Sequence, residues 1–377
     1  MTQRATTPFT FAALAAAILA CASPAHAFTC TWTGAASGLA NNPANWSCGG
    51  SPNPLPVNGD DLVFPDNAPN AASYSHNFLP VPAFGNVTLG KGYTLNGNGM
   101  LFNGTASVTG PLTSQVPFNG MGTGTLTVTG GASINDLAYF QSNLMNIANI
   151  AVGDASGPAH AYIASPSFAP IAVQAQGRLG LAVNADVSSL QVATNGTLVL
   201  SEPPPGFPPP GTLGGPKVYQ QLLLDTGSML EYRIYANGYG SGFIAMQPGS
   251  VATLNAPTLR VMLDDPSQPE PVGSEREIIS FPAGSYALTG AFAGLADGAT
   301  VQASNAPGIY YRINYNTNPN FDGSVTITRV AGPLVPPPGP GNGGGTTAVP
   351  ALGPAGLGLM SLLVAGVGAL RRRKHGA

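Results

Sequence analysis

The sequence predicts an all-β protein: a parallel β-solenoid with an N-terminal cap before it and a C-terminal transmembrane helix after it. Three observations lead to this class. Only 8% of the 377 residues are charged while 44% are hydrophobic, and short apolar runs alternate with turns rich in Gly, Asn and Ser. The longest stretches without Gly or Pro alternate with a period near two, which favours strands over helices. Finally, one short phrase recurs about every 20 residues.

The recurring phrase is an apolar residue, a small polar turn, and a second apolar residue six positions later, as from Val192 to Leu198. It begins at Leu89, Val108, Val128, Val152, Val173, Val192, Leu224 and Met246. The one long interval contains the proline-rich loop 202–211. This period suits one coil of a solenoid, in which stacked coils share a continuous core. The alternative is a β-sandwich or jelly roll, whose strands recur every 8–12 residues or so, roughly half this spacing.

Residues 1–27 have the composition of a signal peptide. A basic start precedes an apolar run over residues 9–20, and Ala25 and Ala27 form the A-x-A pattern of a signal peptidase site. We therefore predict Sec export and cleavage after Ala27. A loose lipoprotein box ending at Cys21 is the alternative, and it would leave a lipidated cysteine instead.

The predicted cap covers residues 28–85 and contains two cysteines. After cleavage at residue 27, only Cys30 and Cys48 remain in the chain. Disulfides persist in the oxidising compartments outside the cytoplasm, so we predict a Cys30–Cys48 bond. A metal site built on the two thiols is the rival interpretation, but no histidine of the chain that begins after Ala27 lies near them in the sequence.

Sequence motifs at both ends of the repeat region are similar to those of a known group of surface proteins. The opening motifs are Thr31-Trp32-Thr33-Gly34, Asn42-Pro43-Ala44-Asn45-Trp46-Ser47 and Gly59-Asp60-Asp61-Leu62-Val63-Phe64. The closing motifs lie at 292–301, 311–315 and 322–328. Together they resemble bacterial surface proteins with autotransporter-associated β-strand repeats. The resemblance implies solenoid repeats over 86–265 and a closing β-segment over 266–331.

The two tryptophans, Trp32 and Trp46, are the only ones in the chain. Solenoid ends expose unpaired strand edges that need a cover, so we expect both indoles to pack over the first coil beside the disulfide. The functional alternative is that both rings stack on a sugar, which would make envelope polysaccharide a partner.

The C-terminal part has the layout of a membrane-directed tail. A linker of Pro and Gly over 332–347 precedes the segment 348–377, in which no residue from Val349 to Leu370 is charged. The segment ends at a basic cluster of Arg371, Arg372, Arg373 and Lys374. About 20 apolar residues span a bilayer as a helix, and basic residues stay on the cytoplasmic side. The tail therefore predicts inner-membrane anchoring with a cytoplasmic C-terminus.

The same tail resembles the IPTL-CTERM class of bacterial sorting signals, relatives of PEP-CTERM. Val349, Pro350 and Leu352 match the family motif, whereas Ala351 stands where the family has threonine. The resemblance implies that these three residues are recognised by an exosortase-like transpeptidase, which removes the tail. A plain single-pass anchor is the alternative.

Charge and composition exclude several functions. All sixteen acidic residues but only eight of the thirteen basic ones lie in 28–347, so the mature body is acidic, which argues against nucleic acid as a partner. Possible catalytic groups are Asp60–Asp61, Asp264–Asp265, Glu275 with Glu277, and the histidines His76, expected in a loop, and His160. Adjacent strand residues point to opposite faces, and Glu275 and Glu277 are expected in a solvated turn.

We therefore expect no catalytic residue, metal site or cofactor. The predicted function is an exported structural or adhesive protein of the cell surface or extracellular matrix, held transiently or stably in the inner membrane by its tail. The alternative is a β-helix that binds or cleaves polysaccharide, a lyase or hydrolase in the latter case.

Overall fold

The computed structural model describes residues 27–129, 137–154, 157–183, 185–200, 215–235, 242–316 and 323–333. The chain divides into two units, 1–335 and 336–377, and all described residues belong to the first. The regular secondary structure of this part consists of strands and two short 3-10 helices, and the strand pairings form a 17-stranded, a 9-stranded and a 4-stranded sheet. Its all-β class agrees with the sequence prediction.

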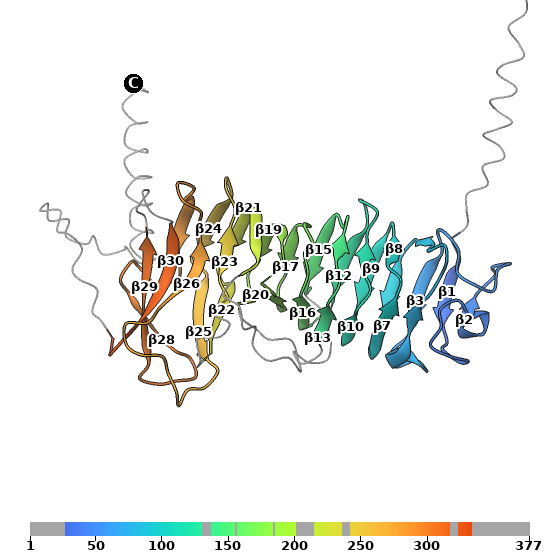
Figure 1. Ribbon diagram of the computed structural model, residues 1–377, viewed down its shortest axis with the longest axis horizontal. Helices are drawn as coiled ribbons and strands as arrows, with labels where there is room; N and C mark the ends of the chain where they lie inside the picture. The colour runs from blue at the N-terminus through green and yellow to red at the C-terminus, as the bar shows by residue number, and fades with distance from the viewer. Residues whose placement is uncertain are drawn as a thin grey trace, which may run out of the picture. The chain divides into compact units, whose positions relative to one another are not determined.

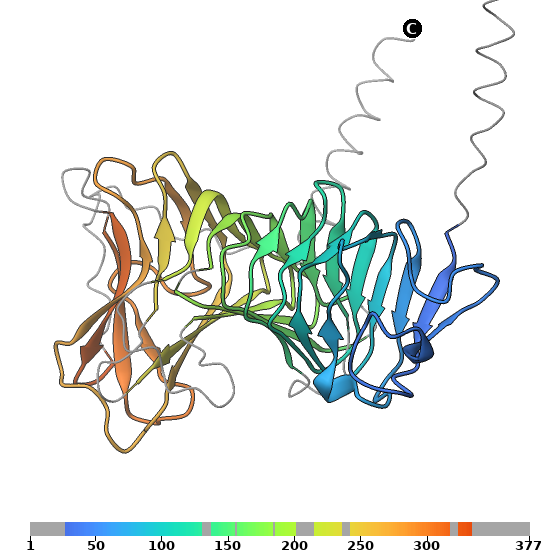
Figure 2. The same ribbon diagram turned by 45° about the vertical axis from the view of Figure 1, so that its right-hand side comes forward.

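Successive strands of the first sheet pair in parallel and lie side by side in both ribbon views (Figures 1 and 2). They are β1 (Thr29–Trp32), β3 (Asp61–Phe64), β6 (Val87–Leu89), β9 (Thr105–Val108), β12 (Thr125–Val128), β15 (Asn149–Val152), β17 (Ile171–Val173), β19 (Val187–Val192), β21 (Lys217–Leu224), β24 (Val251–Asn255) and β27 (Leu288–Ala291). The antiparallel pairs that define a β-sandwich are absent between these strands.

Between successive strands of the first sheet, the chain passes through strands of the second sheet and, in its earlier part, of the third sheet. The second contains β4 (Ser75–His76), β7 (Tyr93–Gly97), β10 (Leu112–Ser114), β13 (Leu137–Phe140), β16 (Ala159–Ile163), β18 (Gly177–Leu181), β20 (Thr197–Leu200), β22 (Met229–Ile234) and β25 (Thr258–Leu263). The third contains β5 (Ala83–Phe84), β8 (Met100–Phe102), β11 (Phe118–Asn119) and β14 (Leu144–Met145). All pairs within these two sheets are parallel.

The repeat starts seen in the sequence form one column of paired residues across the first sheet. Leu89, Val108, Val128, Val152, Val173, Val192 and Leu224 pair one after another. Every one of them is at most 3% exposed, so the column lies in the core. Burying each such side chain contributes roughly 1.5–3 kcal/mol, and the column therefore fixes the register of successive strands.

The sequence phrase misplaces several positions of the repeat. Leu254, and not Met246, pairs with Leu224, because an extra strand β23 (Ile244–Met246) pairs with the beginning of β21. In the second sheet the column runs through Tyr93, Leu112, Ala138, Ala161, Leu179, Leu198, Leu230 and Leu259. Leu179, Leu198 and Leu230 follow the first column by the six positions of the sequence phrase. The earlier members do not, and Tyr93, in place of the expected Leu95, comes four positions after Leu89.

Antiparallel strands close both ends of the described part. At the N-terminal end β2 (Trp46–Cys48) pairs with β1, after the 3-10 helix η1 (Pro43–Asn45), and a second 3-10 helix, η2 (Ala71–Ser73), precedes β4. At the other end lie β26 (Glu275–Ser280), β28 (Thr300–Gln302), β29 (Tyr310–Asn316) and β30 (Ser324–Val330), which pair antiparallel. Such ends cover strand edges that would otherwise pair with other chains.

Three arginine side chains lie within 3.6 Å of one buried carboxylate, that of Glu231 on β22. Glu231 is 2% exposed, and its Oε1 accepts from Arg178 Nη2 at 3.0 Å and from Arg233 Nε at 2.9 Å. Arg260 Nη1 lies 3.6 Å from Oε2. Burial alone raises the pKa of Glu231, but hydrogen bonds and charge from Arg178 and Arg233 outweigh it and hold that pKa below its usual value.

Candidate functional site

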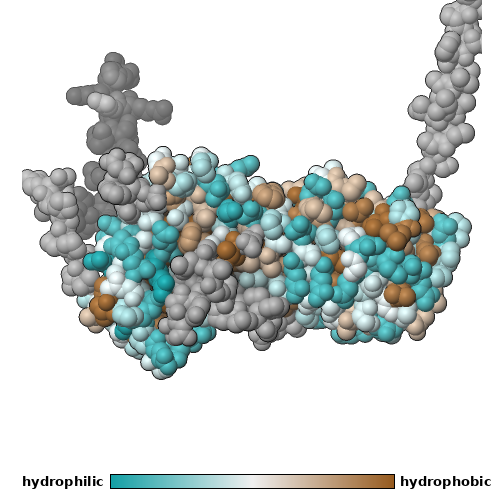
Figure 3. Space-filling view, viewed as in Figure 1, coloured by the Kyte–Doolittle hydropathy of each residue, from teal (hydrophilic) through white to brown (hydrophobic). Residues whose placement is uncertain are grey.

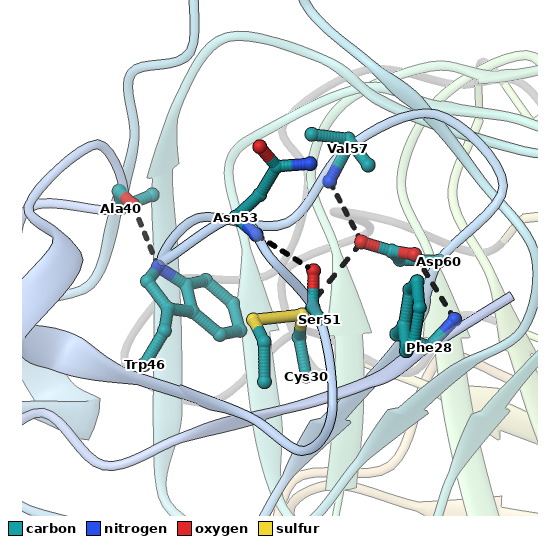
Figure 4. The surroundings of a disulfide bond; sticks show 9 residues. Phe28, Cys30, Ala40, Trp46, Ser51, Asn53, Val57 and Asp60 are labelled. Atoms are coloured by element: carbon teal, nitrogen blue, oxygen red, sulfur yellow. Dashed lines mark hydrogen bonds between the residues drawn. A yellow bond between two sulfur atoms is a disulfide. The ribbon is translucent and has the colours of Figure 1, made fainter.

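The cap is stapled by the predicted disulfide. The antiparallel pairing of β1 with β2 sets Cys30 opposite Cys48, and the two sulfurs are bonded (Figure 4). The bridge joins residues 18 apart in sequence. Closing a loop of that size stabilises the fold by about 3 kcal/mol in the chain-entropy model. The metal interpretation of these thiols is therefore wrong.

Asp60 lies beside the disulfide, and its neighbour Asp61 binds a different part of the chain. The Asp60 carboxylate is 1% exposed and accepts from the backbone N–H groups of Val57 at 2.9 Å and Phe28 at 3.1 Å (Figure 4). Asp61 instead accepts from the backbone N–H of Asn86 at 2.6 Å. The two carboxylates thus serve different backbone groups and do not converge on one ligand.

Both tryptophans pack into the end of the core. Trp32 is 0% and Trp46 8% exposed, and their rings lie 5.2 Å apart, edge to face. Phe64 of β3 packs 5.7 Å from Trp46, whose Nε1 donates to the Ala40 carbonyl at 2.7 Å. A sugar stacks on an exposed ring face, and neither indole offers one. The glycan contact predicted at Trp32 and Trp46 therefore conflicts with their burial.

Asn45 is the residue whose role the sequence alone did not reveal. Its side chain is 0% exposed, and Oδ1 accepts from the N–H groups of Ala36 at 2.8 Å and Ser37 at 3.0 Å. Its Nδ2 donates to Ser37 Oγ at 3.0 Å and to the Leu39 carbonyl at 2.9 Å. One amide therefore binds three backbone groups of the 36–39 loop, the N–H groups of Ala36 and Ser37 and the carbonyl of Leu39. The only available signal was its place in the Asn-Pro-Ala-Asn-Trp motif.

A groove of about 520 Å³ crosses the outside of the cap between residues 55–58 and 77–82. Figure 3 shows hydrophobic residues gathered mainly toward this N-terminal end. The amides beside the groove are already used, because Asn41 and Asn77 bond each other at 2.8 Å and Asn58 Oδ1 accepts from Ala83 N at 2.8 Å. These hydrogen bonds thus hold together the loops that line the groove.

The other carboxylates named from the sequence lie near the C-terminal end. Asp265 accepts from both the N–H and the hydroxyl of Ser267, which makes a local turn and holds the pKa of its carboxyl below the usual value. Glu275 and Glu277 lie in strand β26 and not in a turn, because β26 pairs with β30. No cluster of three His, Cys, Asp or Glu side chains with metal-binding geometry occurs among the described residues.

His76 was expected in a loop but lies in strand β4, since its backbone pairs with Gly97. The ring is fully buried, and Nδ1 lies 2.9 Å from the Tyr74 hydroxyl. Burial lowers the pKa of His76 to about 4. His160 lies in strand β16 opposite Leu137 and Arg178. The histidines are therefore on different strands, and neither forms a catalytic pair with the other.

The buried His76 makes cap stability depend on pH. The pKa of His76 in the folded chain lies below its value in the unfolded chain, so the unfolded chain binds a proton at a higher pH. The free energy of unfolding therefore falls as the pH drops from about 6.5 toward 4. We expect the free energy of unfolding to fall by about 2–3 kcal/mol more in the wild type than in His76→Gln over this range. Urea unfolding of both chains at several pH values measures it, with His160→Gln as the matched control. Parallel pH curves for wild type and His76→Gln would contradict it.

The targeting residues named from the sequence lie mostly outside the described residues. Those outside are Ala25, Cys21, Val349, Pro350, Leu352, Arg371, Arg372, Arg373 and Lys374. Ala27 is described and exposed at the beginning of the cap. Within the described ranges no helix is long and apolar enough to cross a bilayer. The predicted membrane segment 349–370 is not among those ranges.

A comparison with protein families identifies this tail. The model of the IPTL-CTERM motif matches residues 347–374. The chain carries an IPTL-CTERM sorting signal. The match includes Val349, Pro350 and Leu352 as well as the basic cluster, so both parts of the predicted signal lie within it. A comparison with curated proteins finds no match to this chain. The signal marks an exported, surface-destined protein, and signals of this class are generally processed by exosortase-like enzymes.

Proposed function

We propose that this protein is a structural or adhesive component of the cell surface or extracellular matrix, delivered by its IPTL-CTERM tail. The family match over 347–374 is the observation that carries this proposal. Under this proposal, residues 349–370 span the inner membrane as a helix and the basic cluster 371–374 stays in the cytoplasm. An exosortase-like transpeptidase then cuts near Val349 and releases the body outward.

The body itself is proposed to be a parallel β-solenoid without catalytic activity, similar to autotransporter-associated β-strand repeat surface proteins. The unbroken column from Leu89 to Leu254 supports this, because the chain returns to the same sheet in register after each pass. A stack whose ends are capped by antiparallel strands presents a long regular surface while avoiding end-to-end association.

Processing of the tail can be read from intact mass. We expect surface-extracted wild-type protein to end near residue 349, and Pro350→Ala to remain full-length in the inner membrane, because the motif proline is lost. Pro354→Ala lies in the same tail outside the motif and is expected to be processed normally. A wild-type chain that keeps Ala377 at the cell surface would contradict processing and favour a plain anchor.

Polysaccharide binding is a second candidate function, carried by an exposed aromatic pair on the body. Phe168 is 60% and Tyr219 38% exposed, with ring centroids 5.7 Å apart. The Tyr219 hydroxyl donates to Asp186 Oδ2 at 3.3 Å, and Lys217 Nζ lies 4.0 Å from the same carboxylate. Rings beside a carboxylate and an ammonium group suit the apolar face and hydroxyls of a sugar. The acidic body disfavours polyanions, so the proposed ligand is a neutral polysaccharide.

Phe168 also occupies a backbone conformation that favours other residues. Its φ is +49°, in the left-handed region that Asn adopts readily and bulky residues rarely. We expect Phe168→Asn to keep or raise the unfolding temperature while retardation in native gels containing hydroxyethyl cellulose falls at least fivefold. Met121→Asn removes another exposed side chain at positive φ and is the control. Equal retardation of wild type and Phe168→Asn would exclude this site.

A further inference from the structure

The Asp60 carboxylate is buried without a cationic side chain beside it. It is 1% exposed, and no ion pair joins it to a Lys, Arg or His of the described residues. Its Oδ2 accepts from Val57 N at 2.9 Å and lies 3.8 Å from Cys30 Sγ. Burying an ionised carboxylate without a positive partner is costly, so the site suits a cation that no side chain among the described residues supplies.

The remaining oxygen, Oδ1, faces the backbone nitrogen of Phe28 at 3.1 Å (Figure 4). In the precursor this nitrogen belongs to the Ala27–Phe28 peptide and has one hydrogen. Cleavage at the predicted signal peptidase site after Ala27 makes it the first nitrogen of the mature chain. Water adds across the bond, Ala27 keeps the new carboxylate, and the Phe28 amine takes up a proton at neutral pH, where α-amino groups are largely protonated.

We propose that Asp60 binds the α-ammonium group of Phe28 and that the cap is completed only by signal-peptide cleavage. The hydrogen bond is then charge-assisted, because an ammonium group donates to a buried carboxylate. Such a hydrogen bond is stronger than the one that a backbone amide N–H donates to the same oxygen. It secures the beginning of β1, the strand that pairs with both β2 and β3. The inference rests on the exported state in the proposed function, not on how the tail is processed.

The site also distinguishes the two export routes open to this sequence. Cleavage after residue 27 places the new amine against Asp60. Cleavage at Cys21 would leave seven residues ahead of Phe28, whose nitrogen would remain an amide. Only the first route supplies the missing cation. The geometry therefore favours Phe28 as the mature N-terminus.

The test compares two N-termini on the same chain. One starts at Phe28, released from a cleavable fusion, and the other carries two extra alanines before Phe28; both run to Ala377 and are measured in detergent. We expect the Phe28 start to unfold about 4 °C higher at pH 7. The difference should shrink as the pH rises past the pKa of the amine and vanish at pH 11. It should also vanish in Asp60→Asn.

Acetylating the amine of the Phe28-start chain should lower its unfolding temperature to that of the extended chain, which gives a readout if Asp60→Asn does not fold. Equal unfolding temperatures for the two N-termini would overturn the proposal. A difference that persists in Asp60→Asn, or that does not change between pH 7 and pH 11, would do so as well. None of these outcomes depends on the sorting signal, so this proposal and the delivery proposal can fail separately.

Discussion

Replacing Asn45 with alanine is expected to destabilise the protein by about 4 kcal/mol or more. The amide makes four hydrogen bonds while fully buried, to two N–H groups, one carbonyl and one hydroxyl. Removing it takes the amide partner away from the N–H groups of Ala36 and Ser37, the Leu39 carbonyl and the Ser37 hydroxyl, and each buried hydrogen-bonding group left unsatisfied costs about 1–3 kcal/mol. Urea unfolding of the oxidised mature chain measures the loss.

A matched control is available in the same cap. Asn53 is exposed, so Asn53→Ala should change stability by no more than about 0.5 kcal/mol. Asn45→Asp separates the two halves of the amide, because it keeps the acceptors for Ala36 and Ser37 but loses the donors and buries a charge. If Asn45→Ala unfolds like Asn53→Ala, the buried amide does not hold the loop.

Replacing Glu231 with alanine is the second change expected to have a large effect. Removing one partner of a buried ion pair typically costs about 3–5 kcal/mol. Here the loss leaves Arg178, Arg233 and Arg260 close together without the carboxylate that they surround. Because the folded pKa of Glu231 is lowered, its contribution is present above the unfolded pKa and disappears as pH falls through the folded one.

The control for Glu231 is Glu275→Ala, which removes an exposed carboxylate from strand β26. We expect the free energy of unfolding to change little in this variant, since exposed charges contribute about 0–1 kcal/mol. Arg260→Ala removes the most exposed of the three arginines, 42% exposed, and should cost less than Glu231→Ala. Similar unfolding midpoints for Glu231→Ala and Glu275→Ala would show that the arginine cluster does not stabilise the body.

The sequence was most informative where one side-chain type repeats at fixed spacing. The repeat starts from Leu89 to Leu224 pair in one column, because each buries an apolar side chain at the same point of every pass. Prediction failed where an additional strand lies between two column positions. Met246 has the expected composition but lies in an added strand, and Leu254, eight residues on, takes the column position.

Short strands held by distant partners were not visible in the sequence. Strand β4 is two residues long, and only its pairing with Asn96 and Gly97 makes His76 a buried strand residue. Glu275 and Glu277 were misplaced for the same reason, since β30 lies about 50 residues further along the chain. The disulfide was predictable because compartment and cysteine count leave one pairing, whereas the bonds of Asn45 depend on where its loop folds.

The in-register column also determines how this chain can change its length. Every pass offers its neighbours a buried apolar residue at the same height, as Val152, Val173 and Val192 do. Deleting residues 153–173 would therefore set Val152 against Val192, and the stack would shorten by one strand spacing of about 4.8 Å. Duplicating the same segment would lengthen it equally. The length of the stacked strands is thus set by the number of repeated segments, and it can be changed without altering either end.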